Sequence, residues 1–437
     1  MLTWFGDIKP GHPYWWDGAD MPDFPDTAPL RTDILVIGAG YTGLSAAIAA
    51  HDAGADVAVV DAALPGNGAS TRNGGMFGAH PRLGWKVLAD TYGEVTADAV
   101  FAEATPAMQF AKELIKKEKI QCNLYQTGRI QLAYTAAQFD AQKQLAVQVA
   151  AKSDVQVHIV ERADLEQEIN TETYFGGIVF PEHCGIHPRK FHNGLLAATL
   201  ARDILVAAHC PVTKLVYIPG GYRATTPKGT ISCEKVILAT NGYTPDIFRW
   251  FQRRVFPLPS YIIATEPLDP KLIDHLAPGR RMMVETRARH SYFRISPDGS
   301  RILFGGRSSM LNIDPVTAAK RLRQTMLEIW PDLSDVRITH SWTGNTGYSF
   351  SGMPQVGEQD GLHYAMGFSG SGTVMAPYLG AKAGLRAAGA PGGETAYSDT
   401  GFKTSWLHPT SHPHFLKAAD IWYRTRVDHQ DRHARRR

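Results

Sequence analysis

The stretch DILVIGAGYTGLSAAIAAHDAGADVAVVD, residues 33–61, decides the fold that we expect for this chain. It opens with a short apolar run, 33–37, and closes with a second one, 56–61. Apolar runs of this length are typical of strands buried on both faces, as in a parallel sheet. The alanine-rich segment between them, 44–53, predicts a helix. Together they predict one strand–helix–strand unit in about 30 residues.

Three glycines follow the first run in the pattern G-x-G-x-x-G: Gly38, Gly40 and Gly43. The first permits a tight turn, the second lets the backbone approach a pyrophosphate, and the third lets the helix pack closely on the strand. The N-terminus of that helix offers unpaired N–H groups to phosphates. Asp61 ends the next strand, 18 residues after Gly43, where its carboxylate can accept hydrogen bonds from ribose hydroxyls. This combination predicts dinucleotide binding.

The composition restricts the classes of function. The chain has 437 residues, of which 44% are hydrophobic and 20% charged, so we expect a packed core in two or three domains. A net charge of +3 argues against a general nucleic-acid binder. The four cysteines are far apart with no C-x-x-C pair, which argues against a disulfide scaffold or a cysteine-ligated metal. We expect no metal site.

We expect neither a membrane span nor a secretory signal in this sequence. No apolar run approaches the roughly 18 residues of a membrane helix. The first residues lack the basic start and the apolar stretch of a secretory signal. We therefore expect a soluble, cytoplasmic protein with no membrane span, and nothing in the sequence indicates an oligomeric state.

Several further elements are expected from the sequence pattern. Aromatic residues and prolines crowd residues 1–29, so we expect an extended arm whose aromatic side chains pack on the body. Apolar periodicity predicts helices at 94–119, with a break near Pro106, and at 135–152, 188–201, 315–330 and 415–423. Residues 362–389 repeat the opening order of strand, glycine-rich loop and helix.

Three later segments favour FAD over NAD as the dinucleotide. The segment GASTRNGG, 68–75, has small side chains and hydroxyls that suit a flat ring and a phosphate chain. The segment ATNG, 239–242, ends a strand far along the chain, and GFSGSGT, 367–373, precedes a helix near the C-terminus. A second glycine-rich loop at a helix start suits a long cofactor that is contacted along its whole length.

With these motifs, the chain resembles the D-amino-acid-oxidase-like flavoenzymes, which include glycine and sarcosine oxidases. Within them it is most similar to the gamma-glutamylputrescine oxidoreductases. The matching stretches cover roughly residues 12–390 in the expected order. They are 37–45, 68–75, 186–188, 239–243, 264–268, 292–294, 304–306, 342–345, 354–357 and 368–370.

The resemblance implies a fold of mixed class, α/β and α+β, in which a Rossmann-like FAD-binding domain is interleaved with a mixed-sheet substrate domain. The FAD-binding domain is expected at 30–80, 186–245 and 341–390, and the substrate domain at 81–185 and 246–340. Residues 1–29 are the N-terminal arm, and 391–437 form a C-terminal tail.

The resemblance also implies the cofactor contacts, with the pyrophosphate on the first glycine loop and the flavin near the loops around 70 and 370. The expected FAD-binding residues are Gly38, Gly40, Tyr41, Thr42, Gly43, Asp61, Ala62, Ala69, Ser70, Arg72, Asn73, Gly74, Gly75, Met76, Val212, Thr240, Asn241, Gly242, Trp342, Gly344, Gly367, Phe368, Ser369, Gly370, Ser371, Gly372 and Thr373.

The chain departs from the family pattern at three positions. Asp61 stands where the family more often has Glu, Ser371 where it often has His, and Leu303 where sarcosine oxidases have Lys. The last departure leaves rapid reaction with oxygen open. No cysteine stands where those oxidases attach flavin covalently, so we expect non-covalent FAD.

The reaction that the resemblance implies is the oxidation of an amine C–N bond by hydride transfer to the flavin, which gives an imine that hydrolyses. Arg294 is expected either to clamp a substrate carboxylate or to form a structural ion pair. Aromatic side chains are expected to wall the amine pocket or to pack in the core, and His80 to shape its entrance. The aromatic candidates are Tyr261, Tyr292, Trp342 and Tyr348.

The sequence leaves several functions open. The substrate is a gamma-glutamylputrescine-like or other polyamine-derived amine, or else an N-methyl, cyclic or D-amino acid. A third alternative is a catalytically silent flavin-binding protein. The electron acceptor is oxygen or a respiratory carrier, and no nucleic-acid partner is expected.

Overall fold

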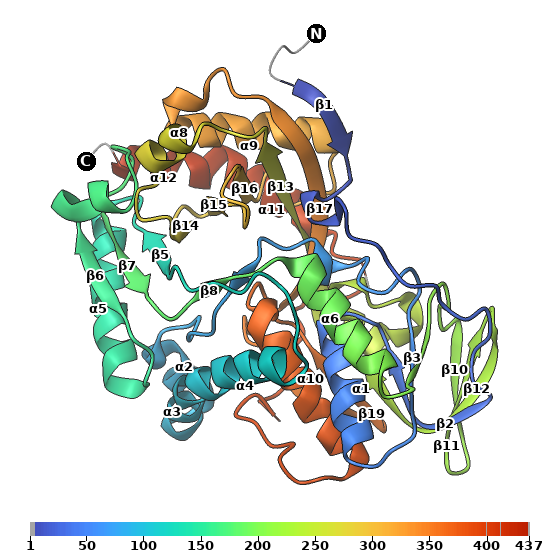
Figure 1. Cartoon of the computed structure of the whole chain (residues 1–437). Helices are drawn as coiled ribbons and strands as arrows, with labels where there is room; N and C mark the ends of the chain where they lie inside the picture. Colours follow the sequence, from blue (N-terminus) through green and yellow to red (C-terminus); the bar gives the residue numbers. More distant parts are fainter. Residues whose placement is uncertain (1–4, 399, 411, 436–437) are drawn as a thin grey trace.

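The computed structural model describes residues 5–398, 400–410 and 412–435, which form two bodies, one above the other in Figure 1. The lower body is built on a sheet whose central strands are parallel: β12 (Gly229–Leu238), β2 (Arg31–Ile37), β3 (Val57–Val60) and β9 (Leu205–Ala207), in that order. The outer edge of β12 pairs with β11 (Gly221–Thr226) and β19 (Leu362–Met366), which in turn pair with β10 (Lys214–Ile218) and β18 (Gln355–Gln359).

The helices of the lower body include α1 (Tyr41–Asp52), α4 (Ala104–Lys117), α6 (Pro188–Leu200) and α10 (Gly372–Ala388) (Figure 1). Of these, α1 and α10 lie against this sheet, α6 packs on α1, and α4 packs on α10. The two helices that follow the glycine loops, α1 and α10, cross closely because Gly380 and Gly384 have no side chain. A methyl group on either glycine would overlap a carbonyl oxygen of α1. Both loops therefore begin at one edge of the sheet.

The upper body is built on a nine-stranded mixed sheet that collects segments from most of the chain. Its order is β1 (Phe5–Pro10), β17 (Ile338–Ser349), β13 (Val255–Thr265), β16 (Ile302–Gly306), β15 (Ser291–Ile295), β14 (Met282–Glu285), β5 (Arg129–Leu132), β7 (Gly176–Phe180) and β6 (His158–Glu161).

The two faces of this sheet have different environments, as side-chain alternation requires. On β5, Ile130 and Leu132 belong to the apolar core that includes residues of α9 (Pro315–Ile329). The alternate residues, Arg129 and Gln131, line the cavity between the two bodies instead. The sheet thus has one core face and one face toward the site.

The division of the chain between the two bodies differs from the expected boundaries in three places. The N-terminal arm contributes β1, which tolerates Pro10 because it is an edge strand. The helical region 85–117, expected in the substrate domain, packs its apolar side chains into the core of the lower body. Strand β17 lies wholly in the upper sheet, although residues from 341 onward were expected in the FAD-binding domain.

The expected helices are present with small shifts in their bounds. The region 94–119 forms α3 (Glu94–Ala102) and α4, and the break falls at Glu103 because Pro106 sits in the first turn of α4, where a missing N–H is tolerated. The region 135–152 forms α5 (Ala136–Lys152), which begins with a capping box of Thr135 and Gln138.

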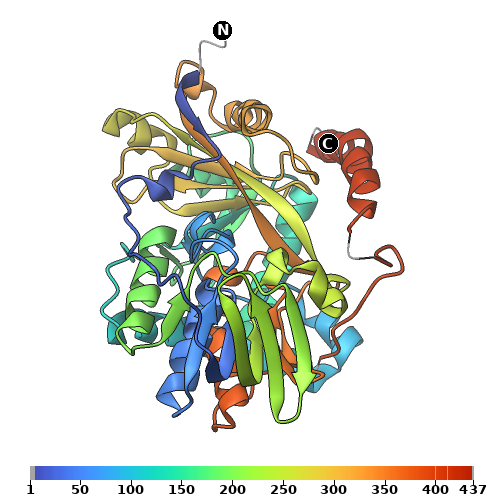
Figure 2. The same ribbon diagram turned by 90° about the vertical axis from the view of Figure 1, so that its right-hand side faces the viewer.

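The C-terminal tail ends in helices that pack beside the upper sheet, as Figure 2 shows. They run through α11 (Phe415–Trp422) and α12 (Asp428–Arg435). Asp420 on α11 is buried and accepts hydrogen bonds from the amide of Met310 at 2.7 Å and the hydroxyl of Ser309 at 3.2 Å. Among the described residues, no helix is long and apolar enough to cross a membrane.

Candidate active site

A cavity of about 730 Å³ lies between the two bodies. One part of its wall is the glycine loop, α1 and the ends of β3 and β12, and the opposite part is the site-facing side of the upper sheet. This volume is toward the upper end of the range for small-molecule sites. The cavity is therefore large enough for a dinucleotide and lies where two sets of side chains converge.

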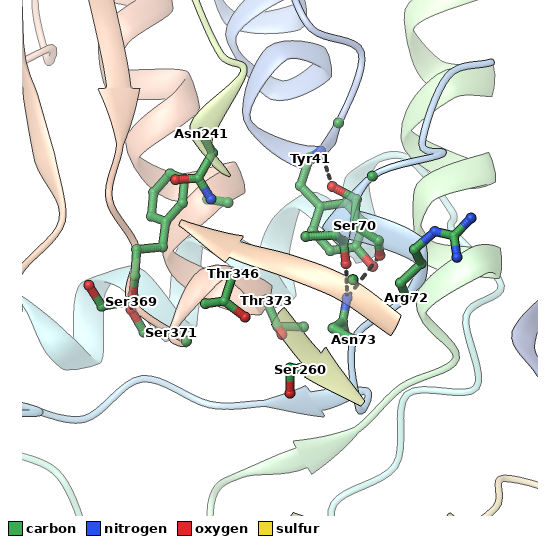
Figure 3. A pocket seen from close by; sticks show the side chains of 18 of the residues that line it. Tyr41, Ser70, Arg72, Asn73, Asn241, Ser260, Thr346, Ser369, Ser371 and Thr373 are labelled. Carbon is green, nitrogen blue, oxygen red and sulfur yellow. Dashed lines mark hydrogen bonds between the residues drawn. The ribbon is translucent and has the colours of Figure 1, made fainter. Parts of the chain in front are cut away.

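The glycine loop at the start of α1 is shaped for close approach. Gly38 has a φ of +108°, and a methyl group there would lie 2.9 Å from the carbonyl oxygen of Ala239. A methyl group on Gly40 would lie 2.8 Å from the hydroxyl of Ser70, which accepts a hydrogen bond from the Tyr41 amide at 3.0 Å (Figure 3). Position 38 therefore requires glycine. At the start of α1, the cavity is lined by Gly38, Gly40, Tyr41 and Thr42.

Asp61 lies at the other end of this cradle, on the cavity wall. Its carboxylate accepts hydrogen bonds from the amides of Ala39 and Ala63, at 2.8 and 2.9 Å. Burial raises the pKa of Asp61, whereas these two amides favour the charged form. The Asp61 side chain is thus fixed by two hydrogen bonds, and its carboxylate oxygens can each accept a further one.

Three tryptophan side chains, buried or half-buried, donate hydrogen bonds to the loop that contains Asn73. Trp15 donates to the carbonyl of Asn73 at 2.8 Å, Trp342 to the carbonyl of Arg72 at 2.9 Å, and Trp16 to the hydroxyl of Thr71 at 2.8 Å. The N-terminal arm, which contributes two of the three, therefore supports the cavity wall.

Trp15→Phe is expected to weaken FAD binding several-fold. The change leaves the buried carbonyl of Asn73 without its donor, which costs about 1–3 kcal/mol and loosens the loop. Isothermal titration of the apoprotein with FAD measures the effect. The matched control is Trp406→Phe, because Trp406 is 86% exposed. Equal dissociation constants for the two variants would contradict this role of the arm.

The loop before α10 completes the cofactor side. The side-chain oxygen of Asn241 accepts from the Gly367 amide at 2.9 Å, and the hydroxyl of Ser371 donates to the carbonyl of Phe368 at 2.8 Å. Figure 3 shows Ser369 and Ser371 on one side of the pocket, Tyr41, Ser70 and Asn73 on the other, and Thr373 between them. The two loops thus face each other across the space that a cofactor would occupy.

Most of the residues that we expected to bind FAD line this cavity. The exceptions are Gly43, Gly75, Gly242, Trp342 and Gly367, which do not line it. Gly43 nevertheless affects the shape of the cavity wall, because a methyl group at this position would overlap the carbonyl oxygen of Gly38. Arg72 lines the cavity but turns its guanidinium away from it (Figure 3), toward the carbonyls of Asn67 and Thr343.

Of the expected substrate-pocket residues, His80, Tyr292 and Tyr348 line the cavity. Tyr292 donates to or accepts from the hydroxyl of Ser260 at 2.8 Å, and its ring lies over Gly74, where a methyl group would approach it to 2.9 Å. The glycine at 74 therefore allows the tyrosine of the upper sheet to meet the Asn73 loop.

Arg294, Tyr261 and Trp342 do not line the cavity. Arg294 is buried, and its Nη1 donates to the carbonyls of Gly75 and Ile186, at 2.6 and 3.0 Å, which leaves it poorly placed to clamp a substrate. Tyr261 is two residues from Ile263 on the same strand, so both side chains lie on the core face of the upper sheet. There the hydroxyl of Tyr261 donates a hydrogen bond to the carbonyl of Leu311 at 2.7 Å.

Several charged residues of the cavity wall were not among the expected ones: Arg82, Arg129, Glu285, Arg287, His290 and Arg307. Glu285 and Arg287 form a buried ion pair at 2.8 Å, and Glu285 also accepts from the hydroxyl of Tyr174 at 2.9 Å. Burial beside Arg307 and Arg82 lowers the pKa of His290 to about 3. The period-2 pattern of β5 was the one signal that could have directed attention to Arg129.

His192 supports the glycine loop from α6. Its Nε2 donates to the carbonyl of Ala39 at 2.8 Å, and complete burial lowers the pKa of the imidazole to about 4. The folded state therefore keeps His192 neutral, whereas the unfolded chain protonates it near pH 6.5. Its contribution to stability is present above pH 6.5 and is lost as the pH falls toward 4.

His192→Gln is expected to flatten the pH dependence of stability in this window. One such group contributes a slope of about 1.4 kcal/mol per pH unit. Urea unfolding of both proteins at pH 6.5 and pH 5.0, with saturating FAD, measures the slope. Parallel pH profiles would show that His192 does not titrate on unfolding.

Two further expectations concern covalent and metal chemistry. Leu303 is buried against Trp15 and Trp342 and does not line the cavity. The four cysteines are free and buried, and of these Cys210 lines the cavity, next to Val212. No group of three or more His, Cys, Asp or Glu side chains that could hold a metal ion occurs within the described ranges.

A cavity at the edge of a parallel sheet, lined by two glycine-rich loops and by the carboxylate of Asp61, is typical of a dinucleotide-binding oxidoreductase of the flavoprotein type. Glycines that would collide with backbone if they carried a methyl group show that the wall fits a flat, closely bound cofactor. The chain belongs to the family of FAD dependent oxidoreductases: the family model described as DAO, FAD dependent oxidoreductase, matches residues 33–383.

Individual relatives agree with this assignment. The probable oxidoreductase OrdL of Rhizobium meliloti (strain 1021) is 29% identical over 388 residues, which cover 87% of this chain and 89% of the relative. The gamma-glutamylputrescine oxidoreductase of Escherichia coli (strain K12) is 29% identical over 356 residues, 80% of this chain and 82% of the relative. The crystal structure of glycine oxidase from Geobacillus kaustophilus has the same fold, with a TM-score of 0.69 at 20% identity over 86% of this chain and 99% of that one.

Proposed function

We propose that this protein oxidises the C–N bond of an amine with non-covalently bound FAD, and that the amine is polyamine-derived, as in gamma-glutamylputrescine. The observation that carries the proposal is one cavity in which the FAD cradle faces the aromatic and cationic side of the upper sheet. The relative from Escherichia coli, whose name states this substrate, supports the choice of amine.

FAD, when bound, supplies the chemistry by accepting a hydride, which carries two electrons, from the carbon next to the amine nitrogen. The backbone amides of the Gly38–Gly43 loop and of the start of α10 would hold its phosphates and its polar edge. Asp61 would hold its adenosine ribose. Tyr292 and Tyr348 would wall the substrate and exclude water.

The side chains around the substrate favour the neutral amine, which is the form that can lose a hydride. Arg82, Arg129 and Arg307 bring positive charge to this end of the cavity, and like charge lowers the pKa of a bound ammonium. His80 adds no charge, because burial beside Arg129 keeps the pKa of its imidazole well below the ordinary value. A dedicated side-chain base is therefore not required.

Two contacts support non-covalent binding. Cys210 lies beside Val212, near the adenosine end that Asp61 marks, and away from the loops expected around the flavin ring. The Nε2 lone pair of His80 accepts a hydrogen bond from Arg129 at 3.1 Å and so is engaged. Acid precipitation of the purified protein should release all flavin into the supernatant; flavin in the pellet would contradict this part of the proposal.

Anaerobic reduction of the flavin tests the reaction. Gamma-glutamylputrescine should bleach the flavin absorbance faster than putrescine, sarcosine, glycine or a D-amino acid does. Faster bleaching by one of the amino acids would favour the second candidate, an N-methyl, cyclic or D-amino-acid oxidase or dehydrogenase. The three arginines that line the cavity support this candidate, because a guanidinium group can pair with an amino-acid carboxylate. Bound flavin that no amine reduces would indicate a silent flavin-binding protein. Reoxidation by oxygen or by a quinone then identifies the electron acceptor.

A further inference from the structure

The substrate end of the cavity carries unbalanced positive charge. Arg82, Arg129 and Arg307 all line it, and among the described residues none of them forms an ion pair with a carboxylate. Of the acidic side chains on the wall, Asp61 is at the dinucleotide end, and Glu285 is neutralised by Arg287. Nothing on this wall balances the three guanidinium groups.

Arg129 is the most constrained of the three. Its Nη2 donates to Nε2 of His80 at 3.1 Å, its guanidinium lies 5.0 Å from the centre of the Phe180 ring, and its Nε is buried with no hydrogen-bond partner. Burial and the charge of Arg82 lower the pKa of Arg129 to about 10. A guanidinium in such a place is costly unless an anion arrives to pair with it.

The other two arginines extend this charge toward the cofactor loop. A methyl group on Gly370 would lie 3.0 Å from Nη1 of Arg82, and the Arg82 guanidinium is 6.0 Å from the Tyr348 ring. Arg307 donates to the hydroxyl of Tyr348 and lies over the same ring at 4.8 Å. Arg82 therefore lies close to the cofactor loop, and its charge also acts on Arg129.

The remaining arginines of this region differ in one respect, which is that carboxylates or backbone carbonyls pair with their guanidinium groups. Arg287 pairs with Glu285 at 2.8 Å and with Glu328 at 2.7 Å. Arg294 donates to backbone carbonyls. The contrast separates arginines that hold the fold together from those whose charge faces the open cavity.

We propose that Arg129, assisted by Arg82, binds a carboxylate of the substrate that lies apart from the reacting C–N bond. A planar guanidinium edge matches a carboxylate in two parallel hydrogen bonds, and the Phe180 ring beneath Arg129 keeps that edge fixed. This inference rests on the proposed function and narrows it to amines that carry a carboxylate at their far end.

Carboxylate binding by the FAD-loaded protein tests the inference without turnover. The probes are butyrate and its neutral isostere butyramide, and the readout is the perturbation of the flavin absorption spectrum. In the unaltered protein butyrate should bind and butyramide should not. Arg129→Gln should raise the dissociation constant of butyrate by about 30-fold, as expected for the loss of a charge-assisted hydrogen bond. Equal affinity of both proteins for butyrate would overturn the proposal.

A matched substrate pair tests the same point in turnover. N-glutarylputrescine and N-butyrylputrescine share the reacting amine and the acyl chain, but only the first carries a carboxylate. Arg129→Gln should raise KM for the first by about 30-fold, with kcat little changed, and alter KM for the second by less than about threefold. Equal losses on both substrates would instead indicate a role toward the cofactor.

Two variants guard against misfolding. Arg129→Lys retains the charge and should recover part of the butyrate affinity, which a purely structural arginine would not do. Gln131→Met, two residues along the same face of β5, should shift both substrates alike. If no amine reduces the flavin, the proposed function fails, but the butyrate measurement still decides the role of Arg129.

Discussion

Gly43→Ala is expected to abolish FAD binding and to lower the stability of the lower body substantially. A methyl group at this position would overlap the carbonyl oxygen of Gly38 and approach Cγ1 of Val36 to 3.1 Å. The first contact is with backbone, which cannot rotate away, so α1 must move off β2. Overpacking costs about 1–3 kcal/mol even where side chains can adjust, and here they cannot.

The measurement is the flavin content of the purified variant together with its urea unfolding curve. Gly84→Ala is the matched control: Gly84 precedes α2 (Trp85–Tyr92), and a methyl group there meets nothing closer than the Gln148 side chain at 3.5 Å. The control should bind FAD like the unaltered protein. A Gly43→Ala protein that retains its flavin would show that the turn has room for a methyl group.

Asp61→Ala is expected to weaken FAD binding by about 100-fold or more. The change removes the acceptor for the ribose and leaves the amides of Ala39 and Ala63 without their partner, at about 1–3 kcal/mol for each unsatisfied group. Part of this loss falls on the apoprotein, because Ala39 belongs to the glycine loop itself. Titration of apoprotein with FAD, followed by quenching of flavin fluorescence, gives the dissociation constant.

Asp33→Ala provides the comparison for Asp61. Asp33 is on the neighbouring strand and accepts one backbone hydrogen bond, from Asp56 at 2.9 Å, but it does not line the cavity. It should lose a little stability and no FAD affinity. An Asp33 variant that binds FAD as weakly as the Asp61 variant would show that the effect is a general loosening of the sheet.

The cofactor side of the site could be predicted from the sequence because its requirements are local. A tight turn, a close helix crossing and a ribose acceptor each demand a particular residue at a fixed spacing, as at Gly38, Gly43 and Asp61. The expected loops around Ser70 and Ser371 are cavity-lining for the same reason.

The substrate side could not be predicted in the same way, because it depends on which face of a strand each residue occupies. Arg294 and Tyr261 are of the residue types expected in a substrate pocket. In the structure, however, Arg294 donates hydrogen bonds to loop carbonyls and Tyr261 faces the core. Arg129 is about 240 residues before the loop around Ser371, and the alternating pattern of its own strand does not show which distant segments will lie near it.

The role of the N-terminal arm is a second case. Its aromatic residues were expected to pack on the body, and Trp15 is indeed fully buried. That its indole holds the carbonyl of Asn73 follows only from the docking of β1 on β17, which sets the arm beside the loop. An edge-strand pairing between residues 5–10 and 338–341 is a long-range event with no local signal.

The sequence by itself determined the cofactor class and the strand–helix–strand unit that binds it, because glycine spacing and strand burial are properties of short segments. The tertiary structure alone decided which side chains of the upper sheet line the cavity. Those side chains come from strands that are distant in the chain, and their meeting depends on sheet order and side-chain parity. The unbalanced charge of Arg82, Arg129 and Arg307 becomes visible only when these strands are assembled.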